Sequence, residues 1–187
     1  LVGVLDRFDV ASAHVVGLSL GGLTAMRVAI RNPERVNNLA LLCTSAHFAP
    51  AQPWIDRAAT VRADGVGAIA DGILTRWFTA EYLADERHAE SIAWYRTMIA
   101  DTPAEGYAAC CEALATADVR DDLGSIKAST LAVAGTDDPA TPPERLAAIV
   151  DAVPGGRLEV VAHAAHLANA EQPQVITSLL LEHLEHS

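Results

Sequence analysis

The chain has 187 residues, of which 51% are hydrophobic and 20% are charged. This balance fits a globular domain with a sizeable core and excludes a disordered, collagen-like or low-complexity chain. The 13 Lys and Arg stand against 24 Asp and Glu, and the resulting net charge of −11 argues against nucleic acid or an anionic membrane surface as a partner. No apolar run approaches the roughly 18 residues that a membrane-spanning helix needs.

The first 33 residues predict the end of a helix and then a strand, a sharp turn and a second helix in succession. Residues 1–9 carry apolar side chains at helical spacing, which indicates the end of an amphipathic helix. The run 14–18 is apolar on consecutive positions, as is typical of a strand buried on both faces. Residues 23–30 favour a helix, and Pro33 disfavours helical geometry just before it.

Later segments repeat this alternation of strands and helices. Apolar, β-branched runs predict three more strands at 36–43, 130–135 and 158–162, and helical patterns follow the last two at 143–153 and 173–184. Such alternation predicts a parallel α/β sheet with right-handed crossovers.

About eighty residues between the second and third strands show helical spacing and no strand. We interpret them as an inserted helical cap over 50–126, which separates core parts 1–49 and 127–187. Breaks in its helices are expected near 65–67, 102–103 and Gly106.

Cysteine usage favours a reducing compartment, and we expect a cytoplasmic protein. Cys43, Cys110 and Cys111 are too few for a disulfide framework, and the last two are adjacent. Cys110 is interpreted as helix packing rather than as a nucleophile, because no motif surrounds it.

Residues 17–21 read Gly-Leu-Ser-Leu-Gly and match Gly-x-Ser-x-Gly between a strand and a helix, which is the context of a nucleophile elbow. The turn would project Ser19 Oγ clear of the sheet and leave the Leu20 N–H free to donate to an oxyanion. A side chain at Gly17 or Gly21 is expected to collide with the neighbouring strand or helix. The alternative is an ordinary glycine-rich turn; a phosphate loop is excluded because no Gly-Lys-Ser/Thr follows.

A serine nucleophile needs a histidine base and a carboxylate that orients the base. Asp137 and Asp138 follow the third predicted strand, and His163 and His166 follow the fourth, so all four fall at carboxyl ends of strands. The order serine, aspartate, histidine is that of α/β-hydrolases. The residue pattern leaves open which aspartate acts. The two histidines are a poor metal pair because no ligand cluster accompanies them, and we expect no metal or cofactor.

The chain resembles the α/β-hydrolase family in four blocks, at 17–22, 32–36, 135–142 and 165–173. The resemblance implies an α/β-hydrolase parallel sheet, here with its C-terminal strands only, and a helical cap. In the family's Gly-x-x-Asp pattern the acid is the fourth residue, which selects Asp138. The Ala-His-Leu block selects His166 as the base and leaves His163 as a bystander.

The insertion narrows the resemblance to 3-oxoadipate enol-lactonases, through blocks at 76–79, 102–111 and 118–123. This implies a serine hydrolase that opens a small anionic lactone to 3-oxoadipate, through an acyl-enzyme, in the breakdown of protocatechuate or catechol. Alternatives are a carboxylesterase, a cofactor-free haloperoxidase-like enzyme, a carbon–carbon bond hydrolase or a non-catalytic binding protein on this fold.

Members of the resembled family are longer, and their N-terminal part supplies the first strands and a second oxyanion donor. We therefore expect an N-terminally incomplete member whose strand at 14–18 forms an exposed apolar edge. The 187 residues are expected to fold poorly or to be inactive alone, because loss of one oxyanion donor costs about 10²- to 10³-fold in rate.

Residues 50–125 contain six Arg against thirteen acidic residues, so a discrete donor is needed to recognise a substrate carboxylate. The candidate donors are Arg57, Arg62, Arg76, Arg96 and Arg120. Trp54 and Trp77 are predicted to form pocket walls.

Overall fold

The computed structural model describes residues 1–185 and divides the chain into two compact units. One unit consists of Leu1–Ala46 together with the chain from Val119 onward, and the other is His47–Asp118. No helix within residues 1–185 is both long and apolar enough to cross a membrane.

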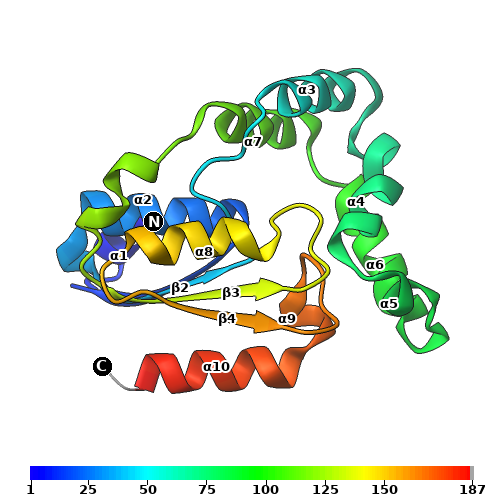
Figure 1. Cartoon of the computed structure of the whole chain (residues 1–187). Coiled ribbons are helices and arrows are strands. Elements are labelled where there is room, and N and C mark those ends of the chain that lie inside the picture. The colour runs from blue at the N-terminus through cyan, green and yellow to red at the C-terminus, as the bar shows by residue number, and fades with distance from the viewer. Residues whose placement is uncertain (186–187) are drawn as a thin grey trace. The chain divides into compact units, whose positions relative to one another are not determined.

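The first unit is built on a parallel sheet in the order β1-β2-β3-β4, which confirms the predicted fold class (Figure 1). The strands are β1 (Ala13–Leu18), β2 (Val36–Leu42), β3 (Ser129–Gly135) and β4 (Arg157–Val161). Because all four run in the same direction, their carboxyl ends lie at one edge of the sheet.

Helices cover both faces of this sheet, as parallel strands require. They are α1 (Val2–Arg7), α2 (Leu20–Arg31), α8 (Pro143–Ala152), α9 (Ala168–Glu171) and α10 (Pro173–Glu185), with 3-10 turns η1 (Pro33–Arg35) and η4 (Arg120–Ser125). Figure 1 shows α2 and α8 on one face and α10 on the other. The short helix α9 was not predicted.

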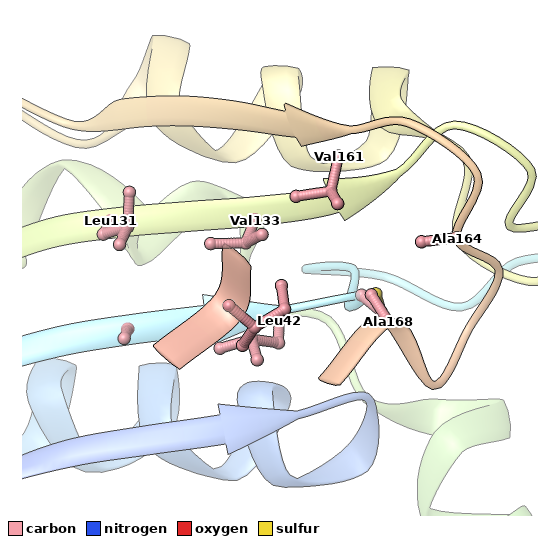
Figure 2. Close-up of a cluster of buried hydrophobic side chains, with 9 residues drawn as sticks. Leu42, Leu131, Val133, Val161, Ala164 and Ala168 are labelled. Carbon is pink, nitrogen blue, oxygen red and sulfur yellow. The ribbon is translucent and has the colours of Figure 1, made fainter. Parts of the chain in front are cut away.

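Strand β3 illustrates why a run of consecutive apolar residues becomes a central strand. Successive side chains of a strand point to opposite faces. Leu131 and Val133 accordingly join Ile176 of α10 in one cluster, part of which Figure 2 shows. Ala132 and Ala134 pack with Leu146 of α8 on the other face.

Strand β1 departs from the expectation of burial on both faces. Val15 is buried, but the Val16 side chain is 46% exposed. The reason is position, since β1 pairs only with β2 and is an edge strand of the described sheet. A hollow of about 630 Å³ lies beside it, lined by residues of α1, β1 and α2. The prediction of an exposed apolar edge therefore agrees with this structure.

The second unit is helical. Its elements are α3 (Gln52–Asp64), η2 (Val66–Ile69), α4 (Ala70–Trp77), α5 (Ala80–Ala84), η3 (Glu86–His88), α6 (Ala89–Ala100) and α7 (Ala104–Thr116). The chain breaks after α3 at Gly65, which has a φ of 78°, and before α7 at Pro103, as expected. The break expected at Gly106 is wrong. Gly106 lies inside α7, because one glycine costs a helix only about 1 kcal/mol.

Two details of the predicted insertion are corrected. The helical unit ends at Asp118 rather than 126, because the 3-10 turn η4 packs against α8 and buries Leu123 and Ile126 with the sheet unit. Cys110 is exposed, and the buried thiol that packs within the helices is that of Cys111.

Candidate active site

Ser19 occupies a strained turn between β1 and α2. Its φ of 54° and ψ of −119° lie in a region that costs a non-glycine residue on the order of 1–3 kcal/mol. Two hydrogen bonds hold this turn, one with the last residue of β2 and one with a residue just after that strand. The Ser19 N–H donates to the Leu42 carbonyl at 2.9 Å, and Thr44 Oγ1 donates to the Ser19 carbonyl at 2.6 Å.

The glycines around Ser19 do not all act as predicted. A Cβ on Gly17 would lie 2.3 Å from the carbonyl oxygen of Gly21, so this position requires glycine. A Cβ on Gly21 would meet nothing within 4 Å, which overturns the expected collision there. The second crowded glycine is Gly22, whose added Cβ would lie 2.7 Å from the Thr44 side chain.

Leu20 is the first residue of α2, a helix of 12 residues. The first four N–H groups of a helix lack an intrahelical acceptor, and the helix dipole makes this end positive. The Leu20 N–H can therefore donate to a negative charge that develops beside Ser19.

Asp138 and His166 form a buried pair at the carboxyl ends of β3 and β4. His166 Nδ1 lies 2.8 Å from Asp138 Oδ2, and the two residues are 5% and 2% exposed. The carboxylate also accepts from the Ala140 N–H at 2.8 Å, from the Thr141 N–H at 3.0 Å and from Thr141 Oγ1 at 2.6 Å. Burial raises the pKa of Asp138, but the hydrogen bonds from His166 and Thr141 outweigh it, so the pKa is lowered. The carboxylate is thus ionised at neutral pH and favours an Nδ1–H tautomer of His166.

The rival residues lie outside this pair. Asp137 is exposed, and its carboxylate accepts a hydrogen bond from Thr136 Oγ1 at 2.9 Å. His163 is exposed as well and is bonded through its backbone: its N–H donates to Thr136 Oγ1 at 3.2 Å, and its carbonyl accepts from Gln172 Nε2 at 3.0 Å. The structure thus brings together the two residues that the family resemblance selected.

Three contributors to the pair were not predicted. A Cβ on Gly135 would lie 2.3 Å from the Ala164 carbonyl oxygen, so this glycine lets the two loops approach each other. Glu171 accepts from the Ala165 N–H at 2.6 Å and holds the residue before His166. Thr141, three residues after Asp138, is fully buried. Its spacing from Asp138 is typical of a turn held by an aspartate side chain, a signal that was available in the sequence.

Among the described residues, no hydrogen bond joins Ser19 Oγ to His166. Such contacts often tighten only when substrate is bound. Residues 1–185 contain no group of three His, Cys, Asp or Glu side chains arranged to hold a metal ion.

The predicted pocket residues lie in the helical unit. Trp54 of α3 is half-buried, and its Nε1–H donates to the Phe48 carbonyl at 2.8 Å. Trp77 of α4 is also half-buried and meets Tyr95 edge to face, with ring centroids 6.4 Å apart. Nothing in this geometry alone assigns either ring to a pocket wall.

The model of the alpha/beta hydrolase family matches residues 1–179. A serine on a strained strand-to-helix turn and a buried histidine–carboxylate pair at the same sheet edge are the hallmarks of that class. The chain belongs to the alpha/beta hydrolase family.

Known relatives confirm the narrower resemblance. The chain is 39% identical to 3-oxoadipate enol-lactonase 2 of Acinetobacter baylyi, over 93% of this chain and 64% of that protein, so it spans less than two thirds of the relative's length. The enol-lactonase structure from Burkholderia xenovorans LB400 superposes with a TM-score of 0.95 at 35% identity, covering 99% of this chain and 70% of that one. A malate-bound thermophilic esterase from Thermogutta terrifontis gives a TM-score of 0.89 at 29% identity, with 98% and 68% covered.

Proposed function

We propose that this protein is a serine hydrolase of carboxylic esters, with Ser19 as nucleophile, His166 as general base and Asp138 as the carboxylate that orients the base. The observation that carries the proposal is the buried 2.8 Å contact between His166 and Asp138, on the sheet edge where the strained turn presents Ser19. This combination of groups is what activates a hydroxyl that is a poor nucleophile at its ordinary pKa.

In the first step, Ser19 Oγ attacks the ester carbonyl while His166 Nε2 takes the hydroxyl proton. The Leu20 N–H donates to the oxyanion of the tetrahedral intermediate. Collapse of the intermediate breaks the bond to the leaving oxygen, which receives the proton from His166. An acyl-enzyme on Ser19 remains.

In the second step, His166 removes a proton from water, and the resulting hydroxide attacks the acyl-enzyme. Ser19 leaves and recovers its proton from His166. One water is consumed in all, and the products are the leaving group in its protonated form and a carboxylic acid, which releases its proton to solvent at neutral pH.

The substrate that we propose is 3-oxoadipate enol-lactone, an intermediate of protocatechuate and catechol breakdown. Its leaving group is an enol, which tautomerises to a ketone and does not readily reclose, so ring opening yields 3-oxoadipate. The 39% identity to an enol-lactonase and the superposition on a second one support this choice. Trp54 and Trp77 are proposed as apolar walls for the ring.

A simple carboxylesterase is the second candidate function. The 29% identical esterase with bound malate supports it, and malate also indicates that this fold can accept a carboxylate-bearing ligand.

A substrate panel separates the two candidates. The values of kcat/KM are measured for the enol-lactone, by its loss of absorbance, and for neutral p-nitrophenyl esters. The 187-residue chain and a form extended to the length of the relatives are compared, each with a Ser19→Ala control. A preference for the lactone supports the proposal; turnover of esters alone makes the protein an esterase. Inactivity of the folded, extended form toward both substrates contradicts the hydrolase proposal.

A further inference from the structure

We propose that Thr44 is a positioning residue for the oxyanion donor: its hydroxyl fixes the direction of the Leu20 N–H and makes that N–H a stronger donor. The inference rests on the proposed function, because an oxyanion forms only if Ser19 attacks an ester carbonyl. Thr44 acts through the peptide group that joins Ser19 to Leu20, and not on the substrate itself.

The Thr44 side chain is anchored to one atom of the serine turn. Thr44 lies two residues after β2 and is fully buried. Its Oγ1 donates to the Ser19 carbonyl oxygen at 2.6 Å, at the short end of the range for a hydroxyl donor. A hydroxyl has one proton to donate, so this bond uses the whole donor capacity of the side chain. The Ser19 carbonyl thus has a fixed partner that water does not displace.

Fixing this carbonyl also fixes the Leu20 N–H, because both belong to one planar peptide group. In a trans peptide the C=O and N–H bonds point in opposite directions. The Ser19 carbonyl also accepts from the Leu23 N–H at 3.1 Å, which closes the first turn of α2. The carbonyl is therefore directed into the helix, and the Leu20 N–H points out of the N-terminal end, where the oxyanion of the proposed reaction forms.

This peptide group needs an anchor because its orientation is strained. The ψ angle of Ser19 sets which way the peptide faces, and its value of −119° with a φ of 54° is unfavourable for a residue with a side chain. Strained conformations persist only where surrounding contacts hold them. Thr44 supplies such a contact from a point 25 residues further along the chain, so the turn does not depend on α2 alone.

A glycine in α2 makes room for the Thr44 side chain. A Cβ on Gly22 would lie 2.7 Å from Cβ, Cγ2 and Oγ1 of Thr44, which is closer than such atoms approach each other. Gly22 is a buried residue of α2, and glycine costs a helix about 1 kcal/mol relative to alanine. The close approach of Thr44 accounts for a glycine that the helix itself disfavours.

The hydrogen bond from Thr44 also changes the polarity of the peptide group. A donor on the carbonyl oxygen polarises the amide and strengthens its N–H, since hydrogen bonds in a chain reinforce one another, and a buried site of low dielectric enhances this effect. The stronger N–H matters most where negative charge develops. Thr44 should therefore stabilise the tetrahedral intermediate more than the bound substrate.

The test uses the form extended to the length of the relatives and the variant Thr44→Val, which keeps the shape and loses the hydroxyl. We expect kcat/KM to fall about 10-fold, less than the roughly 10²- to 10³-fold that loss of a donor itself costs. Thr44→Ser keeps the hydroxyl and should keep the parent's kcat/KM. Thr130→Val is the matched control. Thr130 is 1% exposed and its Oγ1 donates to the Ala128 carbonyl at 2.8 Å, but it lies near the start of β3 and should leave kcat/KM unchanged.

Two inhibitors separate aiming of the donor from a general change of shape. An alkyl trifluoromethyl ketone accepts Ser19 Oγ at its carbonyl carbon, while the serine proton passes to His166 and the ketone oxygen becomes an oxyanion. The alcohol made by reduction of this ketone has a similar shape and forms no oxyanion. Thr44→Val should weaken inhibition by the ketone about 10-fold and leave inhibition by the alcohol unchanged. Equal weakening of both would mean that Thr44 only shapes the site, which overturns the proposal.

Three further results would overturn it: a Thr44→Val kcat/KM equal to the parent's, a Thr44→Ser value as low as that of Thr44→Val, or an equal loss in Thr130→Val. Circular dichroism shows whether each variant is folded, and Thr44→Ala takes the place of Thr44→Val if the valine variant is not. A parent that hydrolyses neither lactone nor ester, and binds the ketone no better than the alcohol, defeats the proposed function together with this inference. An active parent that is insensitive to Thr44→Val defeats this inference alone.

Discussion

Thr141 and His166 reach the same oxygen of one buried carboxylate. Thr141 Oγ1 lies 2.6 Å and His166 Nδ1 lies 2.8 Å from Asp138 Oδ2, and the two donors are 3.3 Å apart. The Thr141 hydroxyl therefore holds one oxygen of the carboxylate, while the backbone N–H groups of Ala140 and Thr141 hold the other. The same hydroxyl borders the imidazole of His166.

Replacement of this hydroxyl tests its part in holding Asp138. Thr141→Val removes one hydrogen bond to a buried charge, so we expect the free energy of unfolding to fall by about 1–3 kcal/mol. In the parent this hydrogen bond lowers the pKa of Asp138, so the pKa should rise in the valine variant and the acid limb of kcat/KM should move to higher pH. Thr141→Ser should restore both values. A valine variant with the parent's pH profile would show that Thr141 only fills space.

Asp138→Asn tests two roles of this carboxylate: it orients the base His166, and it stabilises the folded protein in a pH-dependent way. Loss of the charge permits the wrong tautomer of His166, and kcat is expected to fall about 10⁴-fold. The pKa of Asp138 is lowered in the folded protein, so its stabilisation is present above the unfolded pKa of about 3.9 and is lost as pH falls through the folded value. The difference in unfolding free energy between parent and variant should therefore be constant above about pH 5 and shrink below about pH 4. Urea titrations at several pH values measure it, and a difference that stays constant to pH 3 contradicts the assignment.

The two glycines of the serine motif should respond differently to alanine. Gly17→Ala places a methyl group 2.3 Å from a backbone oxygen that cannot move freely, and a loss of about 2 kcal/mol or more is expected. Gly21→Ala meets nothing within 4 Å and lies in the first turn of a helix, where alanine is preferred over glycine, so the change should be neutral or slightly stabilising. Thermal unfolding of the Gly17→Ala and Gly21→Ala variants measures both changes in stability. Equal losses would mean that the turn is shaped differently from the one described.

The thiols of Cys110 and Cys43 should differ in reactivity. Cys110 is exposed, whereas Cys43 is buried. Burial, followed by the charge of Asp138, raises the pKa of Cys43 to about 12, so its thiol is protonated at pH 8 and a poor nucleophile. Iodoacetamide should modify Cys110 in the folded protein and Cys43 only after unfolding, as peptide mass mapping would reveal. Modification of both at one rate would contradict the packing of Cys43 behind the carboxylate.

Local patterns in the sequence were sufficient for the four strands and for the place of the serine turn. The strand at Val36–Leu42 and the glycine at Gly17 follow from apolar runs and from the needs of a tight turn. The choice between Asp137 and Asp138 did not follow from such patterns. Both residues succeed the same strand, and only the inward turn of the loop at Thr141 decides which carboxylate is buried.

Two features depend on contacts that no single element reveals. The residues of β1 alone predicted burial on both faces, and only the resemblance to longer proteins predicted the exposed edge. Burial of Val16 depends on whether another element lies beside β1, which the strand's own residues do not reveal. Whether Arg57 or Arg62 is already paired depends on how α3 and α7 pack. The exposure of Val16 and the ion pairing of these arginines both depend on contacts between segments far apart in the chain.

The central claim is that His166 and Asp138 activate Ser19, and covalent labelling tests it most directly. The folded form extended to the length of the relatives is treated with a fluorophosphonate, which forms a bond to an activated serine oxygen, and the rate and site of labelling are read by mass spectrometry. We predict a single adduct on Ser19, no adduct in Ser19→Ala, and labelling slowed at least about 100-fold in His166→Ala. A folded protein that is not labelled at Ser19, or that is labelled equally fast without His166, would contradict the account.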